Sequence, residues 1–160
     1  MGISDYDENL RLLQQSGVPF AIHEHEPFTN HQEMGDKLPS PIEALLKTIA
    51  FRVKDSFWIL AGIRAPDRAD YKKLAEVFGI KRGNIVAGSP EEILSDLGQE
   101  IGGVGPLSAR ENVKVVIDQN LLPLGTVYCG MGRRDITLEI QLNDLLKIAN
   151  VQVELIVKEG

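Results

Sequence analysis

Lys47 is the residue whose type and setting first point to chemistry. It shares one face of an alternating, strand-like stretch with Ile49, Phe51 and Val53, because successive side chains of a strand point to opposite faces. If that face is buried, loss of water disfavours the ammonium form and lowers the pKa of the lysine. A buried lysine needs a partner or a function. The competing interpretation is that Lys47 lies at the strand end and extends its charge into water.

A second candidate is the nine-residue stretch GQEIGGVGP, from Gly98 to Pro106, which holds four of the fifteen glycines. Glycine tolerates positive φ angles and close approach of another backbone or a ligand. Such a loop can point several backbone N–H groups into one small volume, as a site for an anion or a carbonyl oxygen requires. The alternative is an ordinary surface connection.

Other reactive side chains give weaker patterns. His23 and His25 face the same side of a short strand, but His31 is the only other histidine, and zinc sites usually need three or four ligands. Cys129 lies in a strand that is predicted to be buried and has no nucleophile motif around it. Gly130-Met131-Gly132 lacks the third glycine and the helix of a dinucleotide-binding fingerprint.

Three basic pairs stand out: Arg133-Arg134, Lys72-Lys73 and Lys81-Arg82. Solvated surface is the default interpretation of each pair, although together they could hold phosphates. The net charge of −6 argues against a protein that coats nucleic acid non-specifically, DNA included, and leaves room for a local basic patch that grips one structured RNA.

Periodicity and capping signals predict the elements that position these residues. The predicted strands cover residues 20–25, 46–53, 57–62, 85–87, 113–118, 126–129, 135–140 and 151–157. Helices are predicted over residues 5–16, over 67–78 with Gly79 as the stop, and over 90–97 with a capping box of Ser89 and Glu92. Helices are also predicted over 144–149 with Asn143 as the N-cap, and briefly after Thr29 and after Ser40. Residues 46–53 and 57–62 are expected to form an antiparallel hairpin. Together, the predicted strands and helices indicate one α/β domain over residues 1–160, with a mixed and mostly antiparallel sheet.

The composition is that of a globular protein, with 43% apolar and 25% charged residues. No apolar run approaches the roughly 18 residues of a membrane span, so no membrane association is expected. The single cysteine excludes an internal disulfide and favours the cytoplasm as the location.

Several of these segments resemble one known family. Leu46-Lys47-Thr48-Ile49-Ala50-Phe51 is similar to the K-T-L-x-F strand of the YbaK/ProX family, the trans-editing aminoacyl-tRNA deacylases related to the editing insertion of bacterial prolyl-tRNA synthetase. The stretch from Gly98 to Pro106 resembles that family's T-G-x-x-P-G-G-V-S-P-F loop. Val116-Ile117-Asp118 and Gly130-Met131-Gly132-Arg133 match later blocks in the same order, so that the resemblance covers roughly residues 20 to 157.

The resemblance implies a barrel-like mixed sheet flanked by helices, and an enzyme that hydrolyses the aminoacyl ester of mischarged tRNA, with Ala- or Cys-tRNA for proline as the expected substrates. It implies no cofactor and no metal. The expected partners are the acceptor end of the tRNA and prolyl-tRNA synthetase. Lys47 is the expected catalytic residue, and the expected substrate-binding residues are Thr48, Gly98, Ile101, Gly102, Gly103, Val104 and Gly132.

The sequence departs from the family pattern inside the loop. Ile101 stands where the family usually has proline, Gly105 where it has serine, and Leu107 where it often has phenylalanine. Proline would fix φ near −65°, which isoleucine does not. The amino-acid specificity is therefore open. Two other functions also stay open: a catalytically silent relative that binds aminoacylated tRNA ends or a synthetase, and a hydrolase for a small ester or amide unrelated to tRNA.

Overall fold

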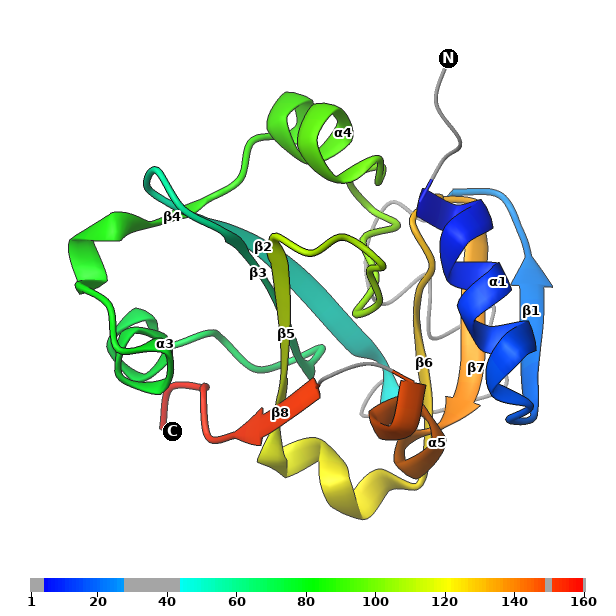
Figure 1. Cartoon of the computed structure of the whole chain (residues 1–160). Helices are drawn as coiled ribbons and strands as arrows, with labels where there is room; N and C mark the ends of the chain where they lie inside the picture. The colour runs from blue at the N-terminus through cyan, green and yellow to red at the C-terminus, as the bar shows by residue number, and fades with distance from the viewer. Residues whose placement is uncertain (1–4, 28–43, 149–150, 160) are drawn as a thin grey trace.

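The computed structural model describes residues 5–27, 44–148 and 151–159 (Figure 1). The strands are β1 (Phe20–Glu24), β2 (Leu46–Val53), β3 (Trp58–Arg64), β4 (Ile85–Ala87), β5 (Val113–Asp118), β6 (Thr126–Gly130), β7 (Ile136–Gln141) and β8 (Val151–Glu154). The helices are α1 (Asp5–Ser16), α3 (Tyr71–Phe78), α4 (Pro90–Leu97) and α5 (Leu142–Ile148), with 3-10 turns η2 (Arg82–Asn84) and η3 (Gln119–Leu124).

The strands form two sheets. The larger has the order β4-β2-β3-β5-β8 and the smaller has the order β1-β7-β6. In the larger sheet β2 pairs antiparallel with β3 and β4, whereas β5 pairs in parallel with β3 and β8. The smaller sheet is antiparallel throughout. This confirms the predicted mixed, mostly antiparallel α/β fold and the hairpin between β2 and β3.

The two sheets meet at one end of β2, where Leu45 forms a parallel bridge with Tyr128 of β6. An apolar core fills the space between the sheets and includes Leu60, Leu97, Val127 and Leu138. A second core lies on the other face of the larger sheet, beneath α3 (Figure 1). Both faces of β2 are therefore covered along its second half, which fixes the direction of every side chain in the strand.

Local capping explains the bounds of two helices. Ser89 and Glu92 form the predicted capping box at the start of α4, with two hydrogen bonds of 3.1 Å. Asp70 accepts a hydrogen bond from the N–H of Lys73, so α3 begins at Tyr71 instead of Asp67. The prediction that Asn143 caps the last helix was wrong, because α5 begins at Leu142 and includes Asn143.

The brief helices predicted after Thr29 and after Ser40 fall outside the described residues. None of the helices in the described ranges has both the length and the apolar character to span a bilayer.

Candidate active site

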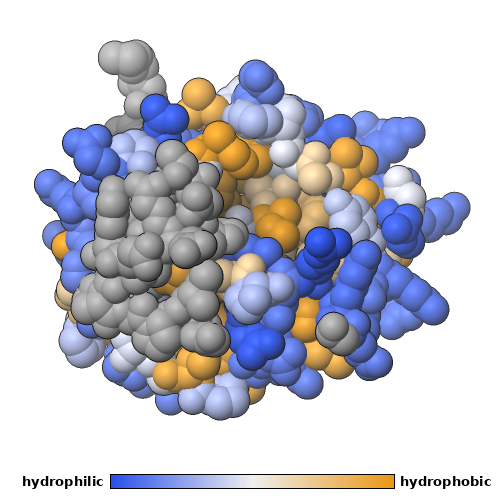
Figure 2. All heavy atoms as spheres, turned by 180° about the vertical axis from the view of Figure 1, so that it is seen from behind, coloured by the Kyte–Doolittle hydropathy of each residue, from blue (hydrophilic) through white to orange (hydrophobic). Residues whose placement is uncertain are grey.

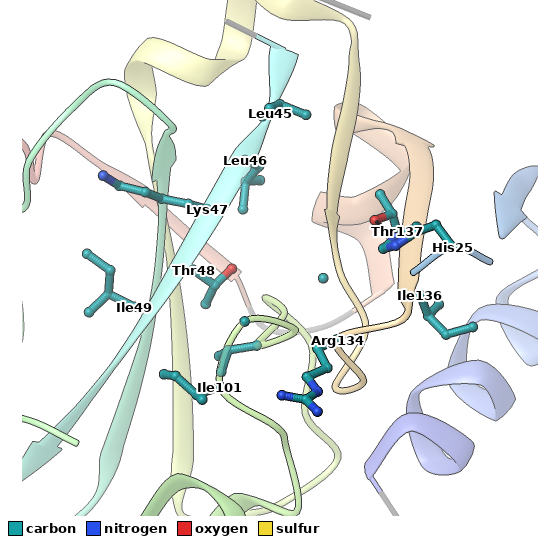
Figure 3. Close-up of a pocket in the computed structure, with 13 residues that line it drawn as sticks. His25, Leu45, Leu46, Lys47, Thr48, Ile49, Ile101, Arg134, Ile136 and Thr137 are labelled. Carbon is teal, nitrogen blue, oxygen red and sulfur yellow. Dashed lines mark hydrogen bonds between the residues drawn. The ribbon is translucent and has the colours of Figure 1, made fainter. Parts of the chain in front are cut away.

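A pocket of about 210 Å³ lies where the first half of β2 faces the glycine loop and the start of β7 (Figure 3). Its walls combine aliphatic side chains with a few polar groups. The lining residues are His25, Leu45, Leu46, Lys47, Thr48, Ile49, Ile101, Gly102, Val104, Gly130, Arg134, Ile136 and Thr137. Five of the eight residues predicted for the site are among them: Lys47, Thr48, Ile101, Gly102 and Val104.

The pocket runs along an edge of β2. One edge of this strand pairs with β3 over its whole length, while β4 covers the other edge only from Phe51 to Val53. The N–H of Gly88 donates to the carbonyl oxygen of Ala50 at that second edge. Because backbone groups of a strand alternate in direction, the N–H and C=O of Thr48 point to the same edge as those of Ala50. The pocket is thus bordered by strand backbone as well as by side chains.

Lys47 lies half-buried near the start of β2. Burial lowers the pKa of its ammonium group, nearby Asp67 opposes that effect, and the positive charge of Arg68 adds to it. Among the described residues no hydrogen-bond or ion-pair partner contacts this ammonium group. Figure 3 shows the side chains of Lys47 and Ile49 on one side of β2 and that of Thr48 on the other. Lys47 therefore carries an uncommitted charge at the edge of the pocket.

The hydroxyl group of Thr48 is buried and has no hydrogen-bond partner in the described part of the chain. In Figure 3 it lies on the side of β2 that faces β7. A buried hydroxyl without a partner costs on the order of 1–3 kcal/mol. Thr48 therefore supplies a polar group that a ligand in the pocket could satisfy.

Ile101 lies at the mouth of the pocket with 51% of its surface exposed. Val104 is buried deeper in the same wall. Ile101, at the position where the resemblance predicts proline, is therefore in direct reach of any bound molecule.

The other three residues predicted to bind substrate, Gly98, Gly103 and Gly132, make contacts within the protein. Gly98 ends α4 with a φ of 63°, which favours glycine. The N–H of Gly132 donates to the carbonyl oxygen of Gly103 at 2.7 Å, and a Cβ on Gly103 would overlap the backbone of Arg133. None of the three lines the pocket. The structure gives them a packing role, and their contact with substrate stays a prediction.

Hydrogen bonds inside the protein already use several N–H groups of the loop. The N–H of Glu100 donates to the carbonyl oxygen of Gly132, and the N–H of Gly103 to that of Glu100. The N–H of Gly105 donates to the fully buried side chain of Gln99. Ile101, Gly102 and Val104 are the loop residues that line the pocket and donate no backbone hydrogen bond to another described residue. The described backbone therefore does not use the N–H groups of these three residues.

Eight lining residues were not predicted for the site, and four of them carry polar groups or follow the turn after β6: His25, Arg134, Ile136 and Thr137. Nε2 of His25 lies 2.7 Å from the hydroxyl oxygen of Thr137. Nδ1 of the same ring lies 2.8 Å from the carbonyl oxygen of Glu26. The guanidinium group of Arg134 lies close to Ile101 in Figure 3. Arg134 was noted in the sequence only as half of a basic pair, because nothing in its spacing shows that the turn after β6 returns to the glycine loop.

Helix α1 supports the site from behind. The carboxylate of Asp5 accepts hydrogen bonds of 2.8–3.2 Å from the guanidinium group of Arg110. The side-chain amide of Asn9 donates to the carbonyl oxygen of Leu107. Both contacts fix the segment that follows the glycine loop, so α1 contributes to the position of the loop without touching the pocket.

The alternative chemistries gain no support from the geometry. His23 pairs with Glu139 at 2.8 Å while His25 contacts Thr137, and no cluster of three possible metal ligands occurs within the described ranges; His31 lies outside them. Cys129 is buried as predicted, and burial raises the pKa of its thiol to about 12. A thiol with that pKa is not a nucleophile at neutral pH.

The chain matches a known protein family. The family model described as "Aminoacyl-tRNA editing domain" matches residues 25–148. Among curated proteins, the chain is 27% identical over 114 residues to an uncharacterized protein of Bacillus subtilis, YwhH, and covers 71% of each sequence. It is 30% identical over 99 residues to a proline–tRNA ligase of Kosmotoga olearia. The matched region is 62% of this chain and 16% of the ligase. The chain thus spans only a small part of that ligase.

Solved structures agree in fold. The hypothetical protein APE2540 superposes with a TM-score of 0.83 at 20% identity, covering 93% of this chain and 98% of that one. A protein described as a candidate trans-editing enzyme for prolyl tRNA synthetase superposes with a TM-score of 0.81 at 21% identity, covering 99% of this chain and all of that one (100%). At these identities the superpositions establish the fold alone.

Proposed function

The chain belongs to the family of aminoacyl-tRNA editing domains, and from this premise we propose that it hydrolyses the aminoacyl ester of mischarged tRNA. The proposed substrates are Ala-tRNA and Cys-tRNA for proline, and the proposed setting is quality control of translation in the cytoplasm. The reaction adds water to the ester carbonyl, breaks its bond to the terminal ribose, and releases the amino acid and a free ribose hydroxyl. We propose no cofactor for it.

One observation carries this proposal: the pocket places the edge of β2, with Lys47 and Thr48, opposite Ile101, Gly102 and Val104 of the glycine loop. An ester already has a good leaving group. The protein then has to bind the end of the tRNA, admit one water molecule and stabilise the negative charge that develops on the carbonyl oxygen.

The loop is the proposed site for that oxygen. The N–H groups of Ile101, Gly102 and Val104 remain after the internal hydrogen bonds have been assigned. A single backbone donor aimed at an oxyanion contributes about 10²–10³ in rate. Lys47 and Arg134 both line the pocket, and their charged groups would hold the terminal ribose and its phosphate. A hydroxyl of the substrate itself would orient the water molecule, since no protein nucleophile is proposed.

The size of the pocket fits a single aminoacyl group. Its volume of about 210 Å³ is below the roughly 300–1,000 Å³ of typical ligand pockets. It has room for an aminoacyl group such as alanine or cysteine and not for a whole nucleotide.

The test is a panel of tRNAs charged correctly and incorrectly, with deacylation measured against the uncatalysed rate. The proposal predicts hydrolysis of Ala- or Cys-tRNA for proline and none of Pro-tRNA. Binding of charged tRNA without turnover of any member would favour the silent relative. Equal hydrolysis of small amino-acid esters without a tRNA body would favour the general esterase.

A further inference from the structure

Positive charge is concentrated in one stretch of this acidic chain. Residues 64–82 contain six lysines and arginines and three acidic residues, whereas the whole chain has a net charge of −6. The acidic residues of the stretch are partly committed. Asp67 is bound to Arg64 by two hydrogen bonds of 2.8 and 3.0 Å, and Asp70 caps α3. The uncompensated charge of the stretch is therefore positive.

The fold gathers these cations on one surface. Ala69 forms an antiparallel bridge with Val157, and the N–H of Lys158 donates to the carbonyl oxygen of Arg68. The guanidinium group of Arg82 lies 5.4 Å from the centre of the Tyr71 ring at the start of α3. We call the exposed cations Arg68, Lys72, Lys81, Arg82 and Lys158 the α3 face. Helix α3 lies at the left of Figure 1 and hence at the right of the back view in Figure 2, where hydrophilic residues gather at the edge.

The α3 face continues to the candidate active site. Lys47, which lines the pocket, is paired with Ile63 near the end of β3, and the turn after β3 leads directly to Arg68. A chain of phosphates whose end occupies the pocket can therefore pass from Lys47 to Arg68 and on to α3. Separated cations of this kind match a phosphodiester backbone, which presents regularly spaced negative charges.

We propose that the α3 face binds the phosphodiester backbone of the tRNA acceptor stem while the aminoacyl end lies in the pocket. This inference rests on the proposed function. Helical RNA is the form that it fits, because base-paired RNA is contacted mainly through its backbone. Single strands are usually held by aromatic rings that stack on bases. The two aromatic residues of this stretch, Tyr71 and Phe78, are only partly exposed and pack against Phe51 and Phe57 respectively.

The experiment compares two double variants that each lose two positive charges. Lys72→Gln with Lys81→Gln changes the α3 face. Arg11→Gln with Lys147→Gln is the matched control on α1 and α5, at the other end of the molecule (Figure 1). Each protein is titrated with deacylated tRNA over a range of salt concentrations, and kcat/KM is measured for full-length aminoacyl-tRNA and for a short aminoacyl-CCA fragment.

The α3-face variant is expected to bind tRNA roughly tenfold more weakly at low salt. The slope of log affinity against log salt should become less steep by about one for each lysine removed. With full-length aminoacyl-tRNA, kcat/KM of the α3-face variant should fall because KM rises while kcat is unchanged. With the short fragment, the variant should have the wild-type kcat/KM. The control variant should match the wild type in all three measurements.

Equal tRNA affinity and equal salt slope in both double variants would overturn the proposal. A surface used only for an acidic protein partner would give this same result. Failure of the proposed function is distinguishable, because then neither the full-length substrate nor the fragment is hydrolysed by the wild type, whatever its affinity for tRNA.

Discussion

The N–H of Gly132 donates a 2.7 Å hydrogen bond to the carbonyl oxygen of Gly103. This contact joins the glycine loop to the turn after β6, and the N–H of Glu100 returns a bond to the carbonyl oxygen of Gly132. Two backbones approach each other here with no side chain between them. Glycines in the loop are thus needed for packing, and that packing fixes the segment that carries Ile101, Gly102 and Val104, three residues that line the pocket.

Replacing Gly105 by alanine tests this packing. The added Cβ would overlap the carbonyl oxygen of Gly130, so we expect Gly105→Ala to lower the free energy of unfolding by about 1–3 kcal/mol and to reduce deacylation. Gly83→Ala is the matched control, because a Cβ there meets no atom within 4 Å; its stability should equal or slightly exceed that of the wild type. Urea titration measures both. Equal stability of the two variants would show that the loops are not tightly packed.

Thr48→Val separates function from stability. Valine keeps the shape of threonine and removes a hydroxyl that has no partner among the described residues. The free energy of unfolding should be unchanged or higher, since an unsatisfied buried hydroxyl is costly. If the hydroxyl binds substrate, kcat/KM should fall about tenfold, the effect of one hydrogen bond of roughly 1.4 kcal/mol. Wild-type kcat/KM in the variant would remove Thr48 from the proposed site.

The pH profile reports the charge on Lys47. Its pKa lies below the ordinary value of 10.5 because of burial, with Asp67 raising it and Arg68 lowering it. If the ammonium form is the active one, activity is full at low pH and falls as pH rises through this lowered pKa. Arg68→Gln should move the fall to higher pH and Asp67→Asn to lower pH.

The profile is measured on the short fragment, to keep tRNA binding by Arg68 out of the result, and the uncatalysed hydrolysis is subtracted at each pH. Identical profiles in the wild type and both variants would contradict a role for the charge of Lys47.

Local features of the fold were predictable because they depend on nearby residues. The capping box of Ser89 and Glu92, the left-handed glycine after α3 and the β2–β3 hairpin were each predicted from a few neighbouring positions. Asn143 was misplaced because β7 continues directly into α5 at Leu142, without an intervening turn.

The candidate site was predictable only in part. Lys47 and the glycine loop stand out in the sequence by type, and the family resemblance joined them. Contacts between distant segments leave no such local signal: His25 meets Thr137, 112 residues away, and Asp5 meets Arg110, 105 residues away. The sequence also could not show which glycines line the pocket and which, such as Gly103 and Gly132, pack behind it.

The most direct test of the account is the rate of deacylation of Ala-tRNA for proline by the wild type, Lys47→Met and the control Lys147→Met. Methionine keeps an unbranched side chain of similar length and removes the charge. Removing an unfavourably buried charge should leave stability equal or higher, because the lowered pKa of Lys47 means that its protonated form opposes folding at neutral pH. We predict that Lys47→Met loses about 10²-fold or more in kcat/KM while Lys147→Met keeps the wild-type rate. Wild-type hydrolysis by folded Lys47→Met would contradict the account.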